Sequence, residues 1–356
     1  MAYFMLVINP GSTSTKIAIF QDETPVFTET LKHSTADVSN YSRIYEQLDF
    51  RKEVILQTLK DKSFDTGLLH AAVGRGGLLK PVESGTYEVN DLMVHDLKIG
   101  VQGQHASNLG GILAYEIAKP LKIPAHIVDP VVVDEMEEVA KLTGLPEIER
   151  KSIFHALNQK AVARRYAAEK GKNYNELDLI VVHMGGGITI GAHRHGRVID
   201  VNDALDGEGP FSPDRSGGLP ARRVVEMCFS GKYTQDQMHR KIAGQGGYVA
   251  YFDTNDARLV EKAASEGDKR PQLVQEAMVY QIAEEIGKSA VALSGKVDAI
   301  LLTGGLAFSN KIVGSIRERI EFIAPVFTYP GENEMLALAQ GCLRVLTGAE
   351  KAKEYK

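Results

Sequence analysis

Residues 9–16, NPGSTSTK, are the first stretch of the chain whose side chains suggest chemistry. Gly11 lets the backbone approach a ligand closely, and Ser12 and Ser14 offer hydroxyl donors. Lys16 adds a positive charge, and turns of this composition can direct several backbone N–H groups at one anion. The same composition is also typical of an ordinary hairpin, because Asn, Gly and Ser favour turns for backbone reasons alone. The stretch is therefore either a plain hairpin or a phosphate-binding turn.

Two more turns of small residues follow apolar strands further along the chain. Gly185, Gly186 and Gly187 come after the apolar run LDLIVVH, and TGG at 303–305 follows another such run. The order strand, small-residue turn, strand, turn, strand occurs near the N-terminus and again in the middle of the chain, although the two copies share almost no letters. Such a repeat predicts two similar domains. Three of these turns at strand ends favour a nucleotide bound in a cleft between the domains, as in actin-like ATPases and sugar kinases.

The spacing of apolar residues predicts the elements that hold these turns in place. Strands are expected at 4–8, 17–20, 25–31, 68–73, 125–128, 177–183, 188–193, 197–201 and 299–302, with a glycine-rich turn at 74–77. Helices are expected at 42–61, 108–119, 153–170, 219–229, 272–293, 311–321 and 334–346. His193 and His195 lie beside a turn with no third ligand nearby, so we expect a solvated hairpin there and not a metal site.

Length and composition describe an ordinary globular protein. The 356 residues exceed what one core usually holds, and 44% hydrophobic with 24% charged residues is typical of globular chains. The net charge of −5 argues against nucleic acid or an anionic membrane as a partner, because both favour clustered Lys and Arg. Two distant cysteines, Cys228 and Cys342, indicate a reducing, cytoplasmic location. No run approaches the roughly 18 apolar residues of a membrane span, and we see no signal peptide.

Several common nucleotide-binding and hydrolytic motifs are absent from the sequence. The only GKS, at 287–289, lacks the first glycine of a P-loop, because that position is Ile282. No strict GxGxxG follows a strand, and neither HExxH nor GxSxG occurs. Phosphate binding, if present, therefore depends on the small-residue turns.

NPGSTSTK, beginning at Asn9, resembles the N-terminal signature of the acetate kinase family, which reads roughly N-x-G-S-S-S-x-K. The family's other motifs follow in order along nearly the whole chain. They are GQHASN with His105, a strand ending in Asp129, FH with His155, HMGGG with His183, DRSGG with Arg215, TNDAR with Asp256 and Arg258, LTGGLAFSN with Gly304, Gly305 and Asn310, and ENEMLALA with Glu334. No single motif would be specific, but this order over some 330 residues is.

The resemblance implies a fold and a reaction. The fold is α/β, with two duplicated actin-like (ribonuclease H-like) domains and a nucleotide cleft between them. Residues 1–130 plus 333–356 would form domain I, and residues 131–332 would form domain II, the main nucleotide-binding side. The reaction is transfer of a phosphoryl group from ATP, with Mg²⁺, to a short carboxylate. The resemblance also implies a homo-oligomer, a dimer or larger.

The resemblance also assigns roles to individual residues. The catalytic set would be His155, Arg215, Asp129 and Arg75; the substrate set would be His105 and Arg75; and Glu334 would be associated with magnesium. The nucleotide-binding set would be Asn9, Gly11, Ser12, Ser14, Lys16, His183, Gly185, Gly186, Gly187, Asp256, Arg258, Gly304, Gly305 and Asn310.

One departure from the acetate kinase pattern bears on the substrate. Acetate kinases carry HRVVHGG where this chain has AAVGRGG at 71–77, so their substrate arginine has no counterpart at Ala72. Arg75 is the candidate replacement from a shifted position. AVGRGG, GQHASN, DALDGEGPFSPDRSGG and TNDAR resemble instead the butyrate kinases and branched-chain carboxylate kinases of the family. This implies the reaction butanoate + ATP giving butanoyl phosphate + ADP.

The chemistry is consistent with these residue types. Phosphoryl transfer to a carboxylate brings two anions together, so the protein must supply cations and hydrogen-bond donors. Arg215 suits phosphate oxygens because its planar fork binds two at once, and His155 can donate to the transferring group. No general base is required, because a carboxylate is already ionised at neutral pH.

Alternatives stay open at this point. Isobutanoate, propanoate or acetate could be the acceptor, and a non-kinase actin-like ATPase could use the nucleotide only to switch shape. A sugar kinase of the same fold would need an aspartate base beside a hydroxyl. The candidate residues also have structural interpretations, as a buried or loop histidine, a surface ion pair, a loop-entry aspartate, a strand-edge lysine or a first-turn acid.

Overall fold

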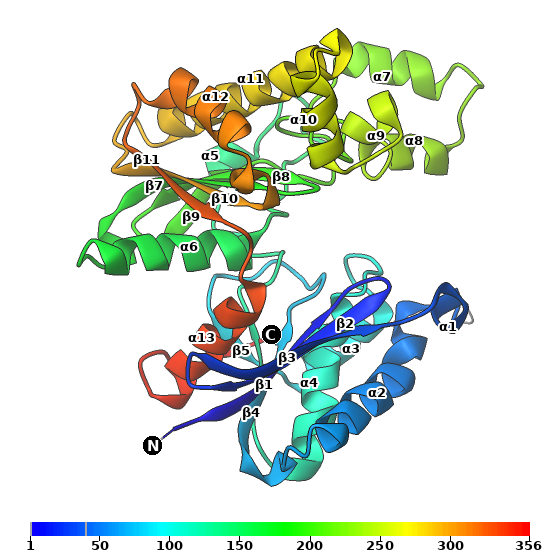
Figure 1. Ribbon diagram of the computed structural model, residues 1–356, viewed down its shortest axis with the longest axis vertical. Coiled ribbons are helices and arrows are strands. Elements are labelled where there is room, and N and C mark those ends of the chain that lie inside the picture. The colour runs from blue at the N-terminus through cyan, green and yellow to red at the C-terminus, as the bar shows by residue number, and fades with distance from the viewer. Residues whose placement is uncertain (1, 40) are drawn as a thin grey trace. The chain divides into compact units, whose positions relative to one another are not determined.

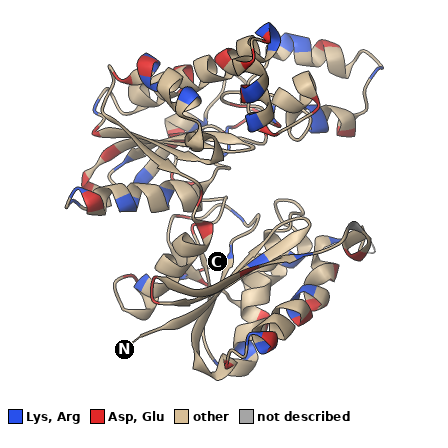
Figure 2. Ribbon diagram, in the orientation of Figure 1, with Lys and Arg blue, Asp and Glu red and all other residues tan. Residues whose placement is uncertain are grey.

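The computed structural model describes residues 2–39 and 41–356 (Figure 1). The chain divides into two compact units. The first unit comprises Met1–Val133 and Asn333–Lys356, and the second comprises Asp134–Glu332. Lys, Arg, Asp and Glu are interspersed along the helices of both units (Figure 2). Among the described residues, no helix is both long and apolar enough to cross a membrane.

The first unit is built on a seven-stranded sheet with the order β12-β5-β6-β4-β1-β2-β3. Its strands are β1 (Phe4–Pro10), β2 (Ser14–Gln21), β3 (Thr24–Lys32), β4 (Leu69–Arg75), β5 (Thr86–Glu88), β6 (Ala125–Val128) and β12 (Lys353–Glu354). β1, β2 and β3 form an antiparallel meander, whereas β1, β4 and β6 run parallel to one another. Its helices are α1 (Thr35–Ser39), η1 (Ile44–Gln47), α2 (Leu48–Asp61), η2 (Thr66–Leu68), α3 (Asp91–Ile99), α4 (Asn108–Leu121) and α13 (Glu334–Leu346).

The second unit is built on a five-stranded sheet with the order β11-β10-β7-β8-β9. Its strands are β7 (Asp178–Met184), β8 (Ile188–Arg194), β9 (Arg197–Val201), β10 (Ala299–Gly304) and β11 (Val326–Pro330). Its helices are α5 (Glu138–Lys141), α6 (Ala156–Glu169), η3 (Tyr174–Glu176), α7 (Ala221–Cys228), α8 (Gln235–Ile242), α9 (Gly247–Phe252), α10 (Ala257–Ser265), α11 (Lys269–Ala292), η4 (Gly305–Phe308) and α12 (Asn310–Ile320).

The two sheets repeat one topology. In each, three antiparallel strands form a meander, and two further strands run parallel to the first strand on its other side. The order β3-β2-β1-β4-β6 therefore matches β9-β8-β7-β10-β11. This is the duplicated α/β fold that the repeat of pattern predicts, and the first unit adds β5 and β12 at one edge.

Strand β7 shows how the second unit forms its core. Ile180 and Val182 pack into a cluster with α11 and α12, whereas Leu179 and Val181 pack into a second cluster with α6. Successive side chains of a strand point to opposite faces of its sheet, so a strand covered on both faces must be apolar throughout. The run LDLIVVH is therefore a central strand with helices on both sides.

Several predicted boundaries are wrong, as three examples show. The helix expected at 42–61 starts as the 3₁₀ turn η1, and α2 begins only at Leu48. The helix expected from residue 153 begins at Ala156. Strand β4 continues through Gly74 and Arg75, where a turn is expected, because these residues pair with β6.

Candidate functional site

In the first unit, three predicted site residues lie at the carboxyl ends of parallel strands. Asn9 is near the end of β1, Arg75 is the last residue of β4, and Asp129 directly follows β6. The carboxyl ends of parallel strands meet at one edge of a sheet, where α/β proteins usually bind ligands. Glu334, the first residue of α13, joins them: Asn9 Nδ2 donates to its Oε2 at 2.6 Å. Arg75 Nη1 lies 3.0 Å from Oε1 and 3.1 Å from Oε2 of the same carboxylate.

Glycines fix the position of Arg75. A Cβ on Gly74 would lie 2.0 Å from the carbonyl oxygen of Gly110 in α4, and one on Gly110 would lie 2.3 Å from that of Arg75. Only glycine at both positions allows α4 to pack this closely on β4. Helix α4 therefore packs directly against the strand backbone that carries Arg75.

Asp129 is held in a conformation unusual for its residue type. Its φ is 37°, in the left-handed region, and its side chain is buried. Ser84 Oγ donates to Asp129 Oδ1 at 2.6 Å, and the Gly85 N–H donates to the same oxygen at 2.8 Å. A non-glycine residue in this region costs of order 1 kcal/mol, a strain that is common at functional sites.

In the turn after β1, the backbone carbonyls of residues 11–14 point into the first unit. The Gly11 N–H donates to the carbonyl oxygen of Ser14 at 2.8 Å, and the N–H of His33 donates to that of Thr13 at 2.9 Å. The carbonyl oxygens of Gly11, Ser12 and Ser14 accept hydrogen bonds from the guanidinium of Arg51. All four carbonyls of residues 11–14 are thus bonded within the unit. Lys16 lies on β2 opposite Asn9, with its side chain exposed.

The sequence reading missed Arg51, although a signal was present. Leu48, Ile55 and Leu59 form the buried face of α2, and Arg51 lies on that same face and is fully buried. An arginine on the apolar side of an amphipathic helix requires internal hydrogen-bond acceptors. The spacing 48, 51, 55, 59 could therefore have marked this residue.

In the second unit, His155 and His183 are stacked. Their ring centroids lie 3.7 Å apart with an interplanar angle of 10°. His155 Nδ1 lies 2.9 Å from Thr189 Oγ1, and His183 Nδ1 lies 2.8 Å from Asn158 Oδ1. Asn158 Nδ2 donates to the carbonyl oxygen of Glu332, so Oδ1 faces His183 and accepts its proton. The predicted catalytic histidine thus rests on a neighbour whose tautomer is fixed.

Buried hydrogen bonds lead from His155 into the core. Gln159 Nε2 donates to the carbonyl oxygen of Thr189 at 3.0 Å and lies 2.9 Å from Thr189 Oγ1. Because a carbonyl only accepts, the Gln159 oxygen faces His193 Nε2, at 3.0 Å, and accepts its proton. Tyr174 donates to His193 Nδ1 at 2.6 Å. With its Oγ1 accepting from Gln159, Thr189 can donate its own proton to His155 Nδ1, and in that arrangement the His155 proton lies on Nε2.

His193 is a correction to the sequence reading. It is fully buried, where a solvated hairpin is expected. Burial lowers the pKa of His193 well below its usual value, with further lowering from Lys160 and Arg164. It is a neutral part of the hydrogen-bond network behind His155.

Arg215 lies against the glycine turn at 185–187. A Cβ on Gly187 would lie 2.1 Å from Arg215 Nη1, so a larger residue there would displace the Arg215 guanidinium from its place beside the turn. Ser212 Oγ donates to the carbonyl oxygen of Gly186 and the N–H of Asp214 also donates to it, so this carbonyl is bonded within the unit, like those of residues 11–14. The Gly185 N–H donates to the carbonyl oxygen of Gly187 at 2.9 Å.

The charges around Arg215 are partly buried. Arg215 Nε lies 3.5 Å from Asp214 Oδ1, and its Nη1 donates to the carbonyl oxygen of Ala204 at 3.2 Å. Burial lowers the pKa of Arg215 and raises that of Asp214. Burial also raises the pKa of Asp203 to about 6. The sequence reading did not single out Asp203 or Asp214, although both lie in the DALDGEGPFSPDRSGG segment.

The turn after β10 needs glycine for two reasons. Gly304 has a φ of 88°, and a Cβ there would lie 2.4 Å from the carbonyl oxygen of Met184 at the end of β7. Gly305 is exposed, and Asn310 begins α12. Strands β7 and β10 are parallel, so His183 and Gly304 lie at the same edge of the sheet.

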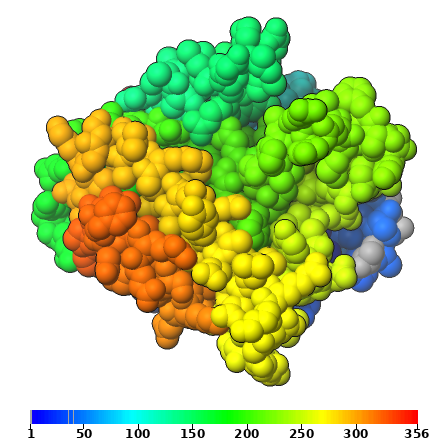
Figure 3. All heavy atoms as spheres, turned by 90° about the horizontal axis from the view of Figure 1, so that it is seen from above, coloured from blue at the N-terminus to red at the C-terminus, as the bar shows by residue number. Residues whose placement is uncertain are grey.

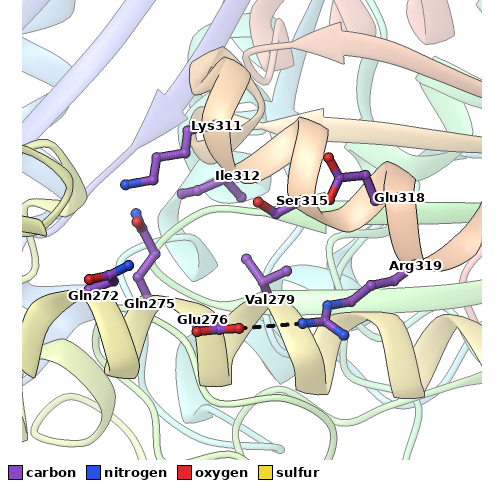
Figure 4. Close-up of a pocket in the computed structure, with 9 residues that line it drawn as sticks. All are labelled: Gln272, Gln275, Glu276, Val279, Lys311, Ile312, Ser315, Glu318 and Arg319. Carbon is purple, nitrogen blue, oxygen red and sulfur yellow. Dashed lines mark ion pairs between the residues drawn. The ribbon is translucent and has the colours of Figure 1, made fainter. Parts of the chain in front are cut away.

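A cavity of about 480 Å³ lies between α11 and α12 (Figure 4). The two helices lie side by side on the face shown in Figure 3, α11 in yellow to gold and α12 in orange. Both begin on the side where β10 ends, because α11 precedes β10 and α12 follows it. The lining residues are Gln272, Gln275, Glu276, Val279, Lys311, Ile312, Ser315, Glu318 and Arg319. Arg319 Nη2 lies 3.7 Å from Glu276 Oε1 across the cavity.

Three predicted residues have local structural partners. Arg258 is exposed and pairs with Asp256, with Nη2 2.6 Å from Oδ2. Asp256 caps α10 by accepting from the Arg258 N–H, and these bonds lower the pKa of Asp256 to about 2. His105 is exposed in the loop before α4, where its Nδ1 accepts from the Ser107 N–H at 3.2 Å.

Comparisons with known proteins decide the family. Residues 126–324, more than half of the chain, match the acetokinase family. Butyrate kinase 1 of Clostridium acetobutylicum is 59% identical over 354 residues, which cover 99% of this chain and 100% of that protein. The chain belongs to the acetokinase family. Butyrate kinase 2 of the same organism is 58% identical over 356 residues, covering both chains completely.

Solved structures of acetokinase relatives share the fold. The acetate kinase of Porphyromonas gingivalis superimposes with a TM-score of 0.80 at 19% identity, over 96% of this chain and 99% of that one. A propionate kinase of Francisella tularensis gives 0.74 at 19% identity, over 95% and 98%. These likenesses support the two-domain actin-like α/β fold.

Proposed function

We propose that this protein transfers the γ-phosphoryl group of ATP to butanoate, giving butanoyl phosphate and ADP. The observation that carries the proposal is the end-to-end match, at 58–59% identity, to proteins named butyrate kinase. Membership of the acetokinase family supports a carboxylate acceptor and ATP as the donor. The cations and hydrogen-bond donors among the candidate residues support such a transfer.

The reaction needs positioning and charge stabilisation more than covalent chemistry. A carboxylate oxygen attacks the γ-phosphorus in line, a P–O bond forms, and the bond to the β–γ bridging oxygen breaks as ADP leaves. No proton is transferred, because the carboxylate is already ionised. The protein must therefore reduce repulsion between two anions and hold them in line.

In the second unit, His155 and Arg215 are the proposed donors to the transferring group. Stacking on His183 orients the His155 ring, and with Thr189 donating to Nδ1, the Nε2–H would donate to the transferring group. Arg215 offers a planar fork that lies directly beside Gly187. The turn at 185–187 would receive phosphate oxygens.

In the first unit, the proposed phosphate contact is the turn at 11–14, whose carbonyls are bonded inside the unit. Arg75 is the proposed contact to the substrate carboxylate, with His105 also on the substrate side. Asp129, held by Ser84 and Gly85, is proposed to orient polar groups beside Arg75 and His105.

Magnesium is the metal proposed for this reaction. Among the described residues, no three His, Cys, Asp or Glu side chains converge on one point. A single carboxylate, that of Glu334, is sufficient for a Mg²⁺ ion that arrives with ATP, because Mg²⁺ usually takes one or two carboxylates together with phosphates and water. When bound, the ion would offset negative charge on the phosphates. Asn9 and Arg75 hold the Glu334 carboxylate in place.

The cavity between α11 and α12 is the proposed site for the adenosine part of ATP. Lys311 and Ile312 line it directly after Asn310, and Gly304 and Gly305 precede them on the same segment. The volume of about 480 Å³ lies within the usual range for small-molecule sites. Asp256 and Arg258 remain proposed nucleotide contacts. The homo-oligomer and the cytoplasmic location likewise remain proposals.

A hydroxylamine-trapping assay tests the function. The purified protein is incubated with Mg-ATP and straight or branched carboxylates of two to six carbons, and acyl phosphate is detected as hydroxamate. The expected maximum is at butanoate. Because each methylene changes binding by only ~1 kcal/mol, isobutanoate and propanoate should also react. A maximum at acetate would overturn the choice of substrate. ATP hydrolysis that ignores every carboxylate would overturn the kinase proposal in favour of an ATPase switch.

A further inference from the structure

Arg51 places a positive charge inside the first unit, directly behind the turn at 11–14. Its side chain is fully buried in α2. Among the described residues, no carboxylate forms an ion pair with it. Burial lowers the pKa of Arg51, and Arg51 in turn helps to lower the pKa of the nearby His33. A buried cation without a counter-ion is costly, so its presence calls for a compensating interaction.

Within residues 2–39 and 41–356, every hydrogen bond of the guanidinium goes to a neutral acceptor. Nη1 donates to the carbonyl oxygens of Gly11 at 2.9 Å and Ser14 at 3.0 Å, and to Thr15 Oγ1 at 2.9 Å. Nη2 donates to the carbonyl oxygen of Ser12 at 3.0 Å. Nε and Nη2 both donate to Gln47 Oε1, at 3.0 and 2.8 Å. These bonds orient the turn, but they leave the positive charge unneutralised.

On its outer side the turn exposes backbone N–H groups and not carbonyl oxygens. Ser12 and Thr13 are exposed, and within the described part of the chain their N–H groups have no acceptor. Their carbonyls are occupied by Arg51 and by the N–H of His33. Backbone N–H groups exposed in succession, with their carbonyls turned away, form an anion-binding turn.

We propose that Arg51 is the positioning residue of this anion site: it holds the turn in its anion-binding form and adds a positive field from behind. The inference rests on the proposed function, because it takes the phosphate chain of ATP as the anion. Arg51 does not touch the ligand. Its effect therefore depends on the charge of the ligand, which distinguishes it from a residue that only stabilises the fold.

Binding of a charged and an uncharged ligand tests the proposal. Calorimetry compares the β,γ-imido analogue of ATP, with Mg²⁺, and adenosine, which lacks phosphates. Arg51→Met removes both charge and fork and should weaken binding of the ATP analogue about tenfold, a size consistent with loss of one charge near an anion, while adenosine binds within about twofold of wild type. Arg51→Lys keeps the charge and loses the fork, and should give an intermediate loss.

Ile55→Ala is the matched control. Ile55 is buried on the same face of α2 but makes none of the turn contacts, so this variant loosens the helix and leaves the turn intact. Both of its affinities should stay within about twofold of wild type. An equal loss for both ligands in Arg51→Met, no loss at all, or the same selective loss in Ile55→Ala would overturn the proposal.

Two further results keep the test independent of folding and of the kinase proposal. If Arg51→Met does not fold, Arg51→Lys against Ile55→Ala decides the matter by the same comparison. If the wild-type protein binds the ATP analogue but forms no hydroxamate, the proposed reaction fails while the role of Arg51 is still measured. A wild type that binds adenosine as tightly as the ATP analogue would overturn the anion site itself.

Discussion

Thr189 carries the contact that orients the proposed catalytic histidine. Its hydroxyl lies 2.9 Å from His155 Nδ1 and 2.9 Å from Gln159 Nε2, and its backbone carbonyl also accepts from Gln159. Thr189→Val keeps the shape and removes only the hydroxyl. We expect kcat to fall about 10- to 100-fold, as for loss of a buried hydrogen bond worth 1–3 kcal/mol, with little change in the KM for ATP.

Thr189→Ser is the matched control for this change, because it restores the hydroxyl and lacks only the methyl group. It should recover most of kcat, and nitrogen NMR of the His155 ring should show Nε2–H in wild type and in Thr189→Ser. Equal loss in the two variants would mean that Thr189 acts only through packing.

At the scale of the secondary-structure element, predictions from local sequence patterns failed where pairing with distant strands determines the structure. GRGG at 74–77 has the composition of a turn, yet Gly74 pairs with Ile8 of β1 and Ile127 of β6 and so remains in the strand. Strand pairing on both sides supplies backbone hydrogen bonds that a local signal cannot reveal. Strands with continuous apolar runs, such as β7, were predicted correctly because burial on both faces leaves its mark in the sequence.

Gly74 provides the prediction at the level of elements. Gly74→Ala would force its Cβ to within 2.0 Å of the Gly110 carbonyl, so α4 must move away from β4. We expect a loss of about 1–3 kcal/mol in unfolding free energy, as for overpacking, together with loss of activity because Arg75 moves. Urea unfolding measures the first effect and hydroxamate formation the second.

Gly314→Ala is the control of opposite sign. Gly314 lies in α12, and no atom of the described residues outside its own stretch of helix lies within 4 Å of the point that a Cβ would occupy. Alanine should therefore stabilise the protein by up to about 1 kcal/mol through helix propensity. If Gly74→Ala were equally harmless, the close approach of β4 and α4 would not control Arg75.

At the scale of the whole molecule, the order of the motifs along the chain identified candidate residues. The topology of each unit then brings some of these residues together. Asn9, Arg75 and Glu334 are far apart in the chain and meet at one sheet edge, and His155 meets His183 in the same way. The supporting roles of Arg51, Gln159 and His193 were missed because these side chains are buried behind the candidate residues. Their contacts depend on which element packs behind which turn, and a single sequence does not specify that.

Three histidines with lowered pKa values predict how the molecule responds to acid. Burial lowers the pKa of His126 to about 4 and that of His193 well below its usual value, and it also lowers the pKa of His33. Between pH 6.5 and 4 the unfolded chain therefore binds protons that the folded chain does not, so stability falls as pH falls. Asp203 has the opposite effect on stability. Its pKa of about 6 makes the folded state bind the extra proton between pH 6 and 3.8, so its contribution to stability rises as pH falls.

His126→Leu isolates one of these contributions in the first unit. His126 is buried, with Nδ1 3.5 Å from Cys342 Sγ, and leucine needs no proton. Relative to wild type, the variant should gain about 2–3 kcal/mol of unfolding free energy between pH 7 and 4.5, from a shift of about 2.5 pKa units. Urea unfolding at pH 7, 5.5 and 4.5 measures this, with His239→Leu on the exposed face of α8 as the control. Parallel pH profiles for His126→Leu and wild type would show that His126 becomes protonated in the folded protein as readily as in the unfolded chain.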